Sequence, residues 1–283
     1  MMLDGVTKHW VDGCPKLCFE ECGEGPPVVF LHGIGGNKRN WRKQQEAISD
    51  FATGIAWDAR GYGDSDDYDG DLHFTDFSYD LLRLIDERGI EKAHFVGLSM
   101  GARILLDFWT VAPTRISTLT LADFFFSFDK SLTPEKQEEF ISMRRKPLME
   151  GMPLSELGSA LIPTLVSQHC SNEAKGEILS SVLELHRESY LKTITATTFF
   201  DASGALPDIR VPVQLIYGVD DQLTPPSIGV EAQALIPNSK LDVIDQAGHL
   251  TNIERPDEFN QLMCSFLKQH LGEASFLSKG SDV

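Results

Sequence analysis

A strand–turn–helix pattern at residues 93–111 limits the chain to a small group of folds. Residues 93–98 are mostly apolar, as in strands that are buried on both faces of a parallel sheet. Residues 100–111 are apolar with helical spacing, and Pro113 stands just beyond them. The sequence between the two elements is Gly97-Leu98-Ser99-Met100-Gly101, which fits G-x-S-x-G. The pattern predicts a tight turn that exposes the Ser99 hydroxyl at one edge of a sheet.

Strand and helix patterns alternate on both sides of this turn. Short apolar runs predict strands at 28–31, 55–57, 116–122, 213–217 and 241–244. Helical spacing of apolar residues predicts helices at 77–88, 228–235 and 256–270. Residues 6–22 predict a hairpin with Asp12-Gly13 in its turn. We therefore expect an α/β fold with a mostly parallel sheet, joined by right-handed crossovers and flanked by helices.

Residues 131–206 interrupt this alternation, because their pattern is helical and contains no good strand. Thr133-Pro134-Glu135 is a helix start, in which a capping Thr is followed by Pro and an acid. Asn172 begins another helical pattern, which runs to Lys192. We expect residues 1–128 and 207–272 to form the sheet domain and residues 129–206 to form a helical lid over the carboxyl edge of the sheet. Residues 273–283 are expected to form a flexible tail.

The charge of the chain disfavours several classes of partner. Its 42 acidic and 25 basic residues give a net charge of −17, which argues against nucleic acid and anionic membrane surfaces. No apolar run approaches the roughly 18 residues that span a bilayer. No basic segment followed by an apolar one marks a signal peptide. We therefore expect a cytoplasmic protein that acts on a small molecule.

No cofactor or metal ion is expected from the residues that could bind one. The five cysteines are an odd number, which does not suit a disulfide framework. Cys14, Cys18 and Cys22 lack the C-x-x-C spacing of zinc sites. The acidic residues within 66–71 lack the Gly-then-Glu pattern of a calcium loop, and we interpret them as a solvated loop.

A serine hydroxyl becomes a good nucleophile only when a base removes its proton. Of the eight histidines, His249 alone lies in a loop after a late strand, whereas His32 suits a structural role in a glycine loop. The base in turn needs a carboxylate that holds its tautomer. Asp221, in the loop after a buried strand, is our prediction, and Asp220 and Asp123 are alternatives.

In four blocks, in order along the chain, the sequence resembles the α/β-hydrolase superfamily. The blocks are His32 to Gly36, Asp58 to Ser65, Gly97 to Gly101, and the late Asp and His loops. In the family pattern D-x-x-x-P the acid is Asp221, and in G-H-x-x-x-x-E-x-P the base is His249. The resemblance covers residues 16–125 and 207–270. It points to the lid-bearing branch that includes 3-oxoadipate enol-lactonases and small-molecule carboxylesterases.

The resemblance implies a serine hydrolase that cleaves a small carboxylic ester or lactone through an acyl-enzyme. It also implies an oxyanion hole formed by the backbone N–H groups of Ile34 and Met100. The same machinery acting on a C–C bond of a diketone, on an amide or in perhydrolysis is an alternative. A non-catalytic ligand-binding protein on this fold is a further alternative, although a receptor does not need all three groups.

Aromatic residues near the expected lid junction suit either an apolar substrate pocket or packing between the lid and the sheet domain. They are Phe124, Phe125, Phe126 and Phe128 after the strand at 116–122, together with Trp41 and Phe199. The sequence leaves these two roles open. It also leaves open whether the lid helices form a homodimer contact instead.

Overall fold

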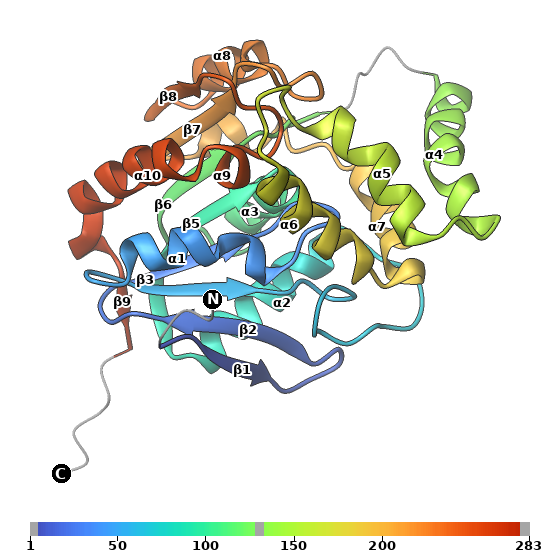
Figure 1. Ribbon diagram of the computed structural model, residues 1–283. Helices are drawn as coiled ribbons and strands as arrows, with labels where there is room; N and C mark the ends of the chain where they lie inside the picture. Colours follow the sequence, from blue (N-terminus) through green and yellow to red (C-terminus); the bar gives the residue numbers. More distant parts are fainter. Residues whose placement is uncertain (1–4, 128–132, 278–283) are drawn as a thin grey trace.

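The computed structural model describes residues 5–127 and 133–277, and a nine-stranded sheet forms the centre of this part of the molecule (Figure 1). Its main strands are ordered β1-β2-β4-β3-β5-β6-β7-β8. The antiparallel end contains β1 (Thr7–Val11) and β2 (Leu17–Cys22), which pair with each other and, through β2, with β4 (Thr53–Trp57). The parallel part continues from β4 with β3 (Pro27–Leu31), β5 (Ile90–Leu98), β6 (Ile116–Ala122), β7 (Val213–Gly218) and β8 (Ser239–Ile244). The expected α/β fold with a mostly parallel sheet is confirmed.

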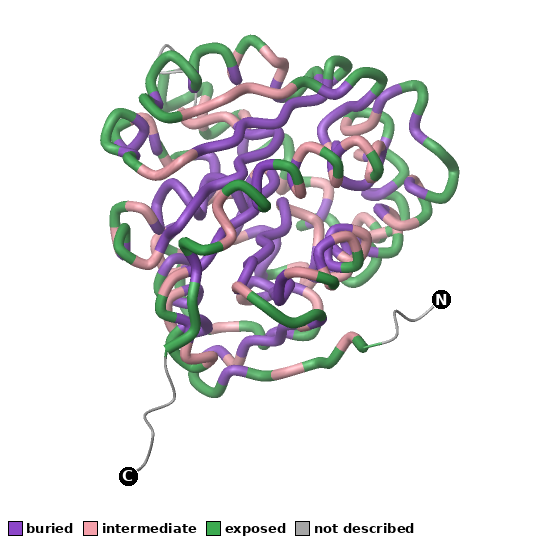
Figure 2. Tube along the Cα trace, turned by 90° about the vertical axis from the view of Figure 1, so that its left-hand side faces the viewer, coloured by how far each residue is buried: buried purple, intermediate pink, exposed green. Residues whose placement is uncertain are grey.

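Helices cover both faces of the sheet, because its strands carry apolar side chains on both sides. In β3, Val29 and Leu31 belong to one core cluster, whereas Val28 and Phe30 belong to the other. The first cluster is covered by α2 (Thr75–Glu87), α3 (Met100–Val111) and α8 (Pro226–Leu235). The second is covered by α1 (Arg42–Ile48) and α10 (Pro256–His270). Figure 2 shows the buried chain concentrated in the strands and along the inner sides of these helices.

Short helical turns complete the connections of the sheet domain. They are η1 (Lys38–Trp41), η2 (Pro113–Arg115), η3 (Leu206–Asp208), α9 (Thr251–Glu254) and η4 (Leu271–Glu273). No helix in the described ranges is long and apolar enough to cross a membrane.

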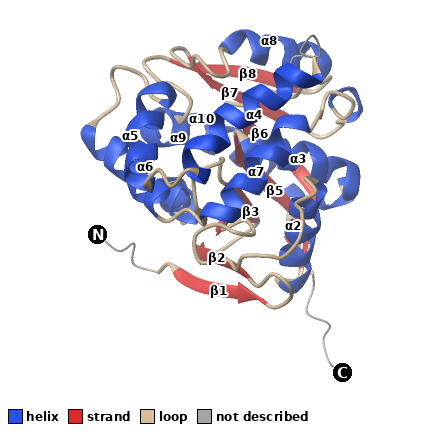
Figure 3. Ribbon diagram, turned by 90° about the vertical axis from the view of Figure 1, so that its right-hand side faces the viewer, coloured by secondary structure: helices blue, strands red, loops and turns tan. Residues whose placement is uncertain are grey.

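Between β6 and β7 the described residues form four α-helices, which we call the helical insertion (Figure 3). They are α4 (Pro134–Met149), α5 (Leu154–Leu165), α6 (Asn172–Leu183) and α7 (Arg187–Phe199). Thr133 and Ser171 cap α4 and α6 by accepting a hydrogen bond from a backbone N–H of the first turn. The single helix expected from Asn172 to Lys192 is wrong, because the chain turns between α6 and α7. His186 has an extended backbone there, and its ring contacts the sheet domain.

The C-terminal part of the described chain is attached to the sheet rather than frayed. Strand β9 (Ser275–Phe276) pairs antiparallel with the start of β5, where Ile90 is opposite Phe276. The Ser117 hydroxyl also donates a hydrogen bond of 2.6 Å to the carbonyl of Glu273. The expectation of a flexible tail is therefore wrong for residues 273–277, whereas residues 278–283 lie outside the described ranges.

Candidate active site

The turn between β5 and α3 holds Ser99 in a strained backbone conformation. Its φ of 53° and ψ of −111° lie in a region that costs a non-glycine residue roughly 1–3 kcal/mol. The neighbouring glycines are needed because a Cβ on Gly97 would lie 2.6 Å from the Gly101 carbonyl carbon, and one on Gly101 would lie 2.1 Å from the Leu31 carbonyl oxygen. The turn thereby presents the half-buried Ser99 side chain at the carboxyl edge of the sheet.

The loop after β8 brings His249 to this hydroxyl. The His249 Nε2 atom lies 2.9 Å from Ser99 Oγ, across 150 residues of sequence. The ring is buried, with 3% of the residue exposed. On its other side, Nδ1 lies 2.8 Å from the Asp221 carboxylate in the loop after β7. Ser99, His249 and Asp221 therefore form one continuous chain of hydrogen bonds at the ends of three strands.

The environment of Asp221 keeps its carboxylate ionised. Burial raises the pKa of Asp221, but the hydrogen bonds and charge of His249 and the hydrogen bonds from Thr224 lower it more, so the pKa lies below its usual value. Two backbone N–H groups, of Leu223 and Thr224, donate to Oδ1 at 2.8 and 2.9 Å. An ionised Asp221 accepts a hydrogen bond from the N–H at His249 Nδ1, so the proton of the neutral ring stays on Nδ1 and the lone pair of Nε2 faces Ser99.

Thr224 is a site residue that the sequence analysis missed. Its hydroxyl donates to the Asp221 Oδ2 atom that also contacts His249, and its Oγ1 lies 3.1 Å from His249 Nδ1. A Thr three residues after a loop Asp is the available signal, because hydroxyl and backbone N–H can then both reach the carboxylate. Thr224 thus fixes the orientation of Asp221 toward the ring.

The two alternative acids, Asp220 and Asp123, lie in environments that differ from that of Asp221. Asp220 is exposed, whereas Asp123 is fully buried with a φ of 46°. One oxygen of Asp123 accepts a hydrogen bond of 3.0 Å from the Gly218 N–H, and the other accepts from the N–H and hydroxyl of Thr251 at 3.2 and 2.6 Å. Burial, followed by the charge of Asp221, raises the pKa of Asp123 well above its usual value. Asp123 therefore links the acid loop to the base loop.

A glycine loop lies against the nucleophile from the side of β3. A Cβ on Gly33 would lie 3.3 Å from the Ser99 Cβ, which places the neighbouring Ile34 beside the turn. His32 Nε2 accepts a hydrogen bond of 3.1 Å from the Ala59 N–H, so Nδ1 carries the proton and donates to the Gly33 carbonyl at 2.9 Å. Burial lowers the pKa of His32, in keeping with a neutral ring that supports the loop. On the opposite side, the Met100 N–H belongs to the first turn of α3 and has no partner within that helix.

The structure places two of the aromatic candidates in the protein core. Trp41 is fully buried between Phe30 and Phe259, with ring centroids 5.2 and 6.1 Å away, so its assignment to a substrate pocket is wrong. Phe124 is also fully buried, and its ring packs at 5.8 Å on Tyr217, which corrects its pocket assignment in the same way. Both rings lie where the sheet meets its covering helices.

The other aromatic candidates are only partly buried or exposed. Phe125 packs at 4.2 Å on the guanidinium of Arg103, and Phe126 is partly buried and packs against the first core cluster. Phe199 ends α7 and is 51% exposed. Phe128 lies outside the described residues.

A polar cavity of about 510 Å³ adjoins the triad on the side of its acid. It lies between the segment that joins α5 to α6 and the loop after β7. Its lining residues are Val166, Ser167, Gln168, Val219, Asp220, Asp221 and Gln222. The insertion and the sheet domain therefore share the walls of a hollow beside Asp221.

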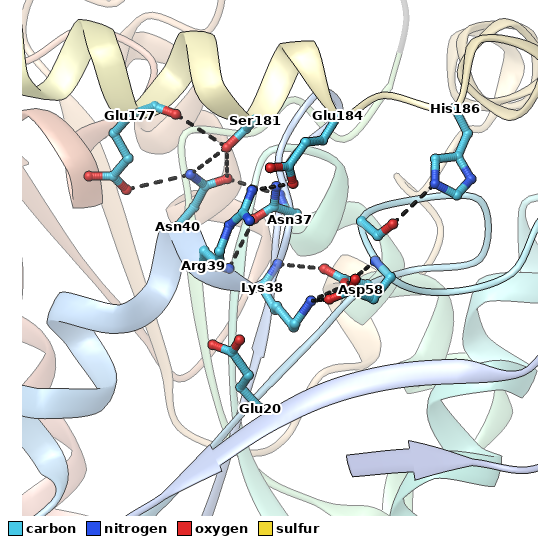
Figure 4. A network of polar contacts seen from close by, with 12 residues as sticks. Glu20, Asn37, Lys38, Arg39, Asn40, Asp58, Glu177, Ser181, Glu184 and His186 are labelled. Atoms are coloured by element: carbon cyan, nitrogen blue, oxygen red, sulfur yellow. Dashed lines mark hydrogen bonds and ion pairs between the residues drawn. The ribbon is translucent and has the colours of Figure 1, made fainter. Parts of the chain in front are cut away.

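Polar side chains join the insertion to η1 (Figure 4). The Asn40 amide donates a hydrogen bond of 2.9 Å to the Ser181 hydroxyl, and Arg39 pairs with Glu184 at the end of α6. Beneath them the buried Lys38 ammonium lies 2.6 Å from the carboxylate of Asp58 and 2.5 Å from that of Asp64. These contacts hold α6 beside the strand ends.

The family model described as the alpha/beta hydrolase family matches residues 28–262. This range covers most of the chain, so the protein belongs to the alpha/beta hydrolase family. The predicted resemblance to this superfamily is confirmed.

Individual relatives cover nearly the whole chain. RutD of Azorhizobium caulinodans, named as a carbamate hydrolase, is 26% identical over 258 residues, which cover 90% of this chain and 96% of the relative. The 3-oxoadipate enol-lactonase 1 of Acinetobacter baylyi is 27% identical over 246 residues, covering 86% and 89%. A thermophilic esterase from Thermogutta terrifontis superposes with a TM-score of 0.85 at 25% identity, covering 94% and 99%. The protein is a hydrolase of this family.

Proposed function

We propose that the protein is a serine hydrolase that cleaves a small carboxylic ester or lactone through an acyl-enzyme. The observation that carries the proposal is the hydrogen-bonded chain from Ser99 through His249 to Asp221, with distances of 2.9 and 2.8 Å. Such a chain lets the base take the serine proton as the hydroxyl attacks. The esterase and enol-lactonase among the similar proteins support this class of substrate.

The reaction follows from the positions of these groups. Ser99 Oγ attacks the carbonyl carbon while His249 Nε2 takes its proton, and the oxyanion forms against the N–H groups of Met100 and Ile34. His249 then gives the proton to the leaving oxygen as the C–O bond breaks, which leaves the acyl group on Ser99. Water attacks the acyl-enzyme and gives a proton to His249, which returns it to Ser99 as the acid leaves.

The helical insertion acts in this proposal as a lid that selects the substrate. It shares the hollow beside Asp221 and contacts η1 and the loop at residues 58–68. We therefore propose that the insertion determines which acyl or alcohol groups are accepted. The residues at the carboxyl edge of the sheet then cleave the bond.

A fluorophosphonate probe tests the nucleophile directly. We expect one label per chain, on Ser99, and no label on Ser99→Ala. The same variant should lose turnover of a p-nitrophenyl ester by about 10⁶-fold. If Ser99→Ala still reacts with the probe or still cleaves the ester, the assignment is wrong.

The second candidate is the same machinery on a different bond. A carbamate hydrolase and hydrolases of 2-hydroxy-6-oxononadienedioate are among the similar proteins, which favours an amide-like or C–C bond as the alternative. A panel of short esters, lactones, carbamates and ring-fission diketones separates the candidates. Labelling of Ser99 with turnover of diketones alone would replace the ester proposal by C–C hydrolysis.

A further inference from the structure

Glu254 is a buried carboxylate that the proposed mechanism does not use. It ends α9 and is 8% exposed. Its Oε1 atom accepts hydrogen bonds from the backbone N–H groups of Gly248 at 3.0 Å and Leu250 at 3.3 Å. Its Oε2 atom accepts one of 2.8 Å from the N–H of Ser167. One carboxylate thus holds both neighbours of His249 and one residue of the helical insertion.

Further hydrogen bonds join the same two segments. The His249 N–H donates to the Leu165 carbonyl at 2.7 Å, and the Ser167 hydroxyl donates to the Gln246 carbonyl at 2.9 Å. The backbones also approach closely, since a Cβ on Gly248 would lie 2.7 Å from both the Leu165 oxygen and the Ser167 nitrogen. Residues 165–167 therefore form one wall of the pocket that holds the base.

A purely local role does not account for these contacts. A carboxylate with a purely local role would accept only from nearby backbone groups, such as the N–H groups of Gly248 and Leu250. The third donor, Ser167, is 87 residues away in sequence and belongs to the segment between α5 and α6. Burial raises the pKa of Glu254, and the hydrogen bonds from the N–H groups of Ser167, Leu250 and Gly248 lower it, so each of the three donors favours the ionised carboxylate.

We propose that Glu254 is a positioning residue for His249. Its hydrogen bonds hold residues 165–167 of the insertion against the loop that carries the base. The inference rests on the proposed role of His249 as the base. It follows that this part of the insertion stays with the sheet edge while substrate enters.

The variant Glu254→Gln tests whether these hydrogen bonds position His249, because it changes the acceptors without changing the size of the side chain. An amide has one acceptor oxygen, so it can serve the His249 loop or Ser167 but not both. We expect kcat for the ester to fall by up to about 10²-fold, as for a small misplacement of a reacting group. The rate of fluorophosphonate labelling should fall in parallel, while KM stays near the wild-type value.

Two glutamate variants serve as matched controls. Glu258→Gln removes an exposed carboxylate that pairs with Arg255 in the first turn of α10. Glu184→Gln removes the contact of the insertion with Arg39 but leaves the His249 loop untouched. Both should keep wild-type kcat and labelling rate, so an effect limited to Glu254→Gln reports on the base and not on the insertion in general.

Amide hydrogen exchange separates positioning from a general loss of stability. Exchange should become faster at Ser167, Gly248 and Leu250 in Glu254→Gln and stay unchanged in Glu184→Gln. A fall in kcat at an unchanged KM, together with faster exchange limited to these three amides, would report a displaced His249 loop and not a loss of folded protein.

The outcomes are decisive in each direction. Wild-type kcat, labelling rate and exchange in Glu254→Gln would overturn the inference while the assignment of Ser99 stands. If Glu254→Gln does not fold, Glu254→Asp keeps the charge but cannot span both segments, and it should show the same loss. Wild-type behaviour of Glu254→Asp would overturn the inference. A wild-type protein that the probe does not label would instead refute the proposed function.

Discussion

The sheet domain and the helical insertion hold their residues in place by different means. At the carboxyl edge of the sheet, backbone approaches leave no space for a side chain at Gly97 or Gly101, and Ser99 is held in a strained turn. Along α6 the insertion meets the sheet domain through side-chain pairs, such as Asn40 with Ser181, whereas residues 165–167 also make backbone contacts with the loop that carries His249. This difference indicates that the proposed reaction depends on the position of the backbone around Ser99, which most substitutions at the neighbouring glycines would disturb. The fit of the insertion depends on contacts that single substitutions adjust.

After the nucleophile itself, the acid at the sheet edge is expected to give the largest effect. Asp221→Asn keeps the shape of the side chain but favours the wrong tautomer of His249, so turnover should fall by about 10⁴-fold. Asp220→Asn, at the exposed neighbouring position outside the hydrogen-bonded chain, should lower turnover by far less. Steady-state kinetics on one p-nitrophenyl ester checks both. A larger loss in Asp220→Asn or Asp123→Asn than in Asp221→Asn would contradict the assignment.

Glycine-to-alanine substitutions in the two regions are expected to change the free energy of unfolding in opposite directions. Gly101→Ala places a methyl group 2.1 Å from the Leu31 carbonyl oxygen, so the free energy of unfolding should fall by about 3 kcal/mol, the upper end for forced overpacking. Gly176→Ala in α6 meets nothing within 4 Å and should raise it by about 0.5–1 kcal/mol, because alanine loses less entropy in a helix. Urea unfolding measures both changes. Equal effects of the same sign would remove the contrast between the regions.

The smallest effect on stability is expected at Asp64, near the interface between the sheet domain and the helical insertion. Hydrogen bonds from Lys38 and Lys8 lower the pKa of Asp64 from 3.8 to about 2. Its ionised form therefore stabilises the fold above pH 4, and this contribution disappears as the pH falls through 2. Because the side chain is 44% exposed, Asp64→Asn should cost less than about 1 kcal/mol at pH 6.

The pH dependence of thermal unfolding checks this expectation. The difference in Tm between the wild type and Asp64→Asn should be positive at pH 6 and shrink between pH 4 and 2. A difference that grows toward low pH would contradict the pairing of Asp64 with the two lysines.

The sequence predicted best those elements whose pattern is local. Strand β6 and the helices α3 and α10 have the predicted bounds, because each combines a continuous apolar pattern with a clear stop. The strand–turn–helix pattern also located Ser99, and two loop motifs selected His249 and Asp221. Their hydrogen-bond geometry agrees with that selection, while their catalytic roles stay a prediction.

The errors arose where distant segments decide the structure. The turn at His186 depends on contacts with the loop that contains Gly63, and β9 exists because β5 offers it an edge. The hydrophobicity of Trp41 could not distinguish a pocket from a core that Phe259 completes from the far end of the chain. Such contacts cannot be predicted from the local sequence, because neither of the two contacting segments shows an unusual pattern of residues.

Neighbouring strands β6 and β7 pair in parallel, and the helical insertion is the crossover between them. A segment of different length with the same two end points would leave every strand pairing unchanged. If the insertion selects the substrate as proposed, the fold therefore offers an exchangeable module for altering substrate preference. The proposed role of Glu254 adds a requirement to such an exchange: a grafted segment must still offer a backbone N–H and a carbonyl where Ser167 and Leu165 now stand.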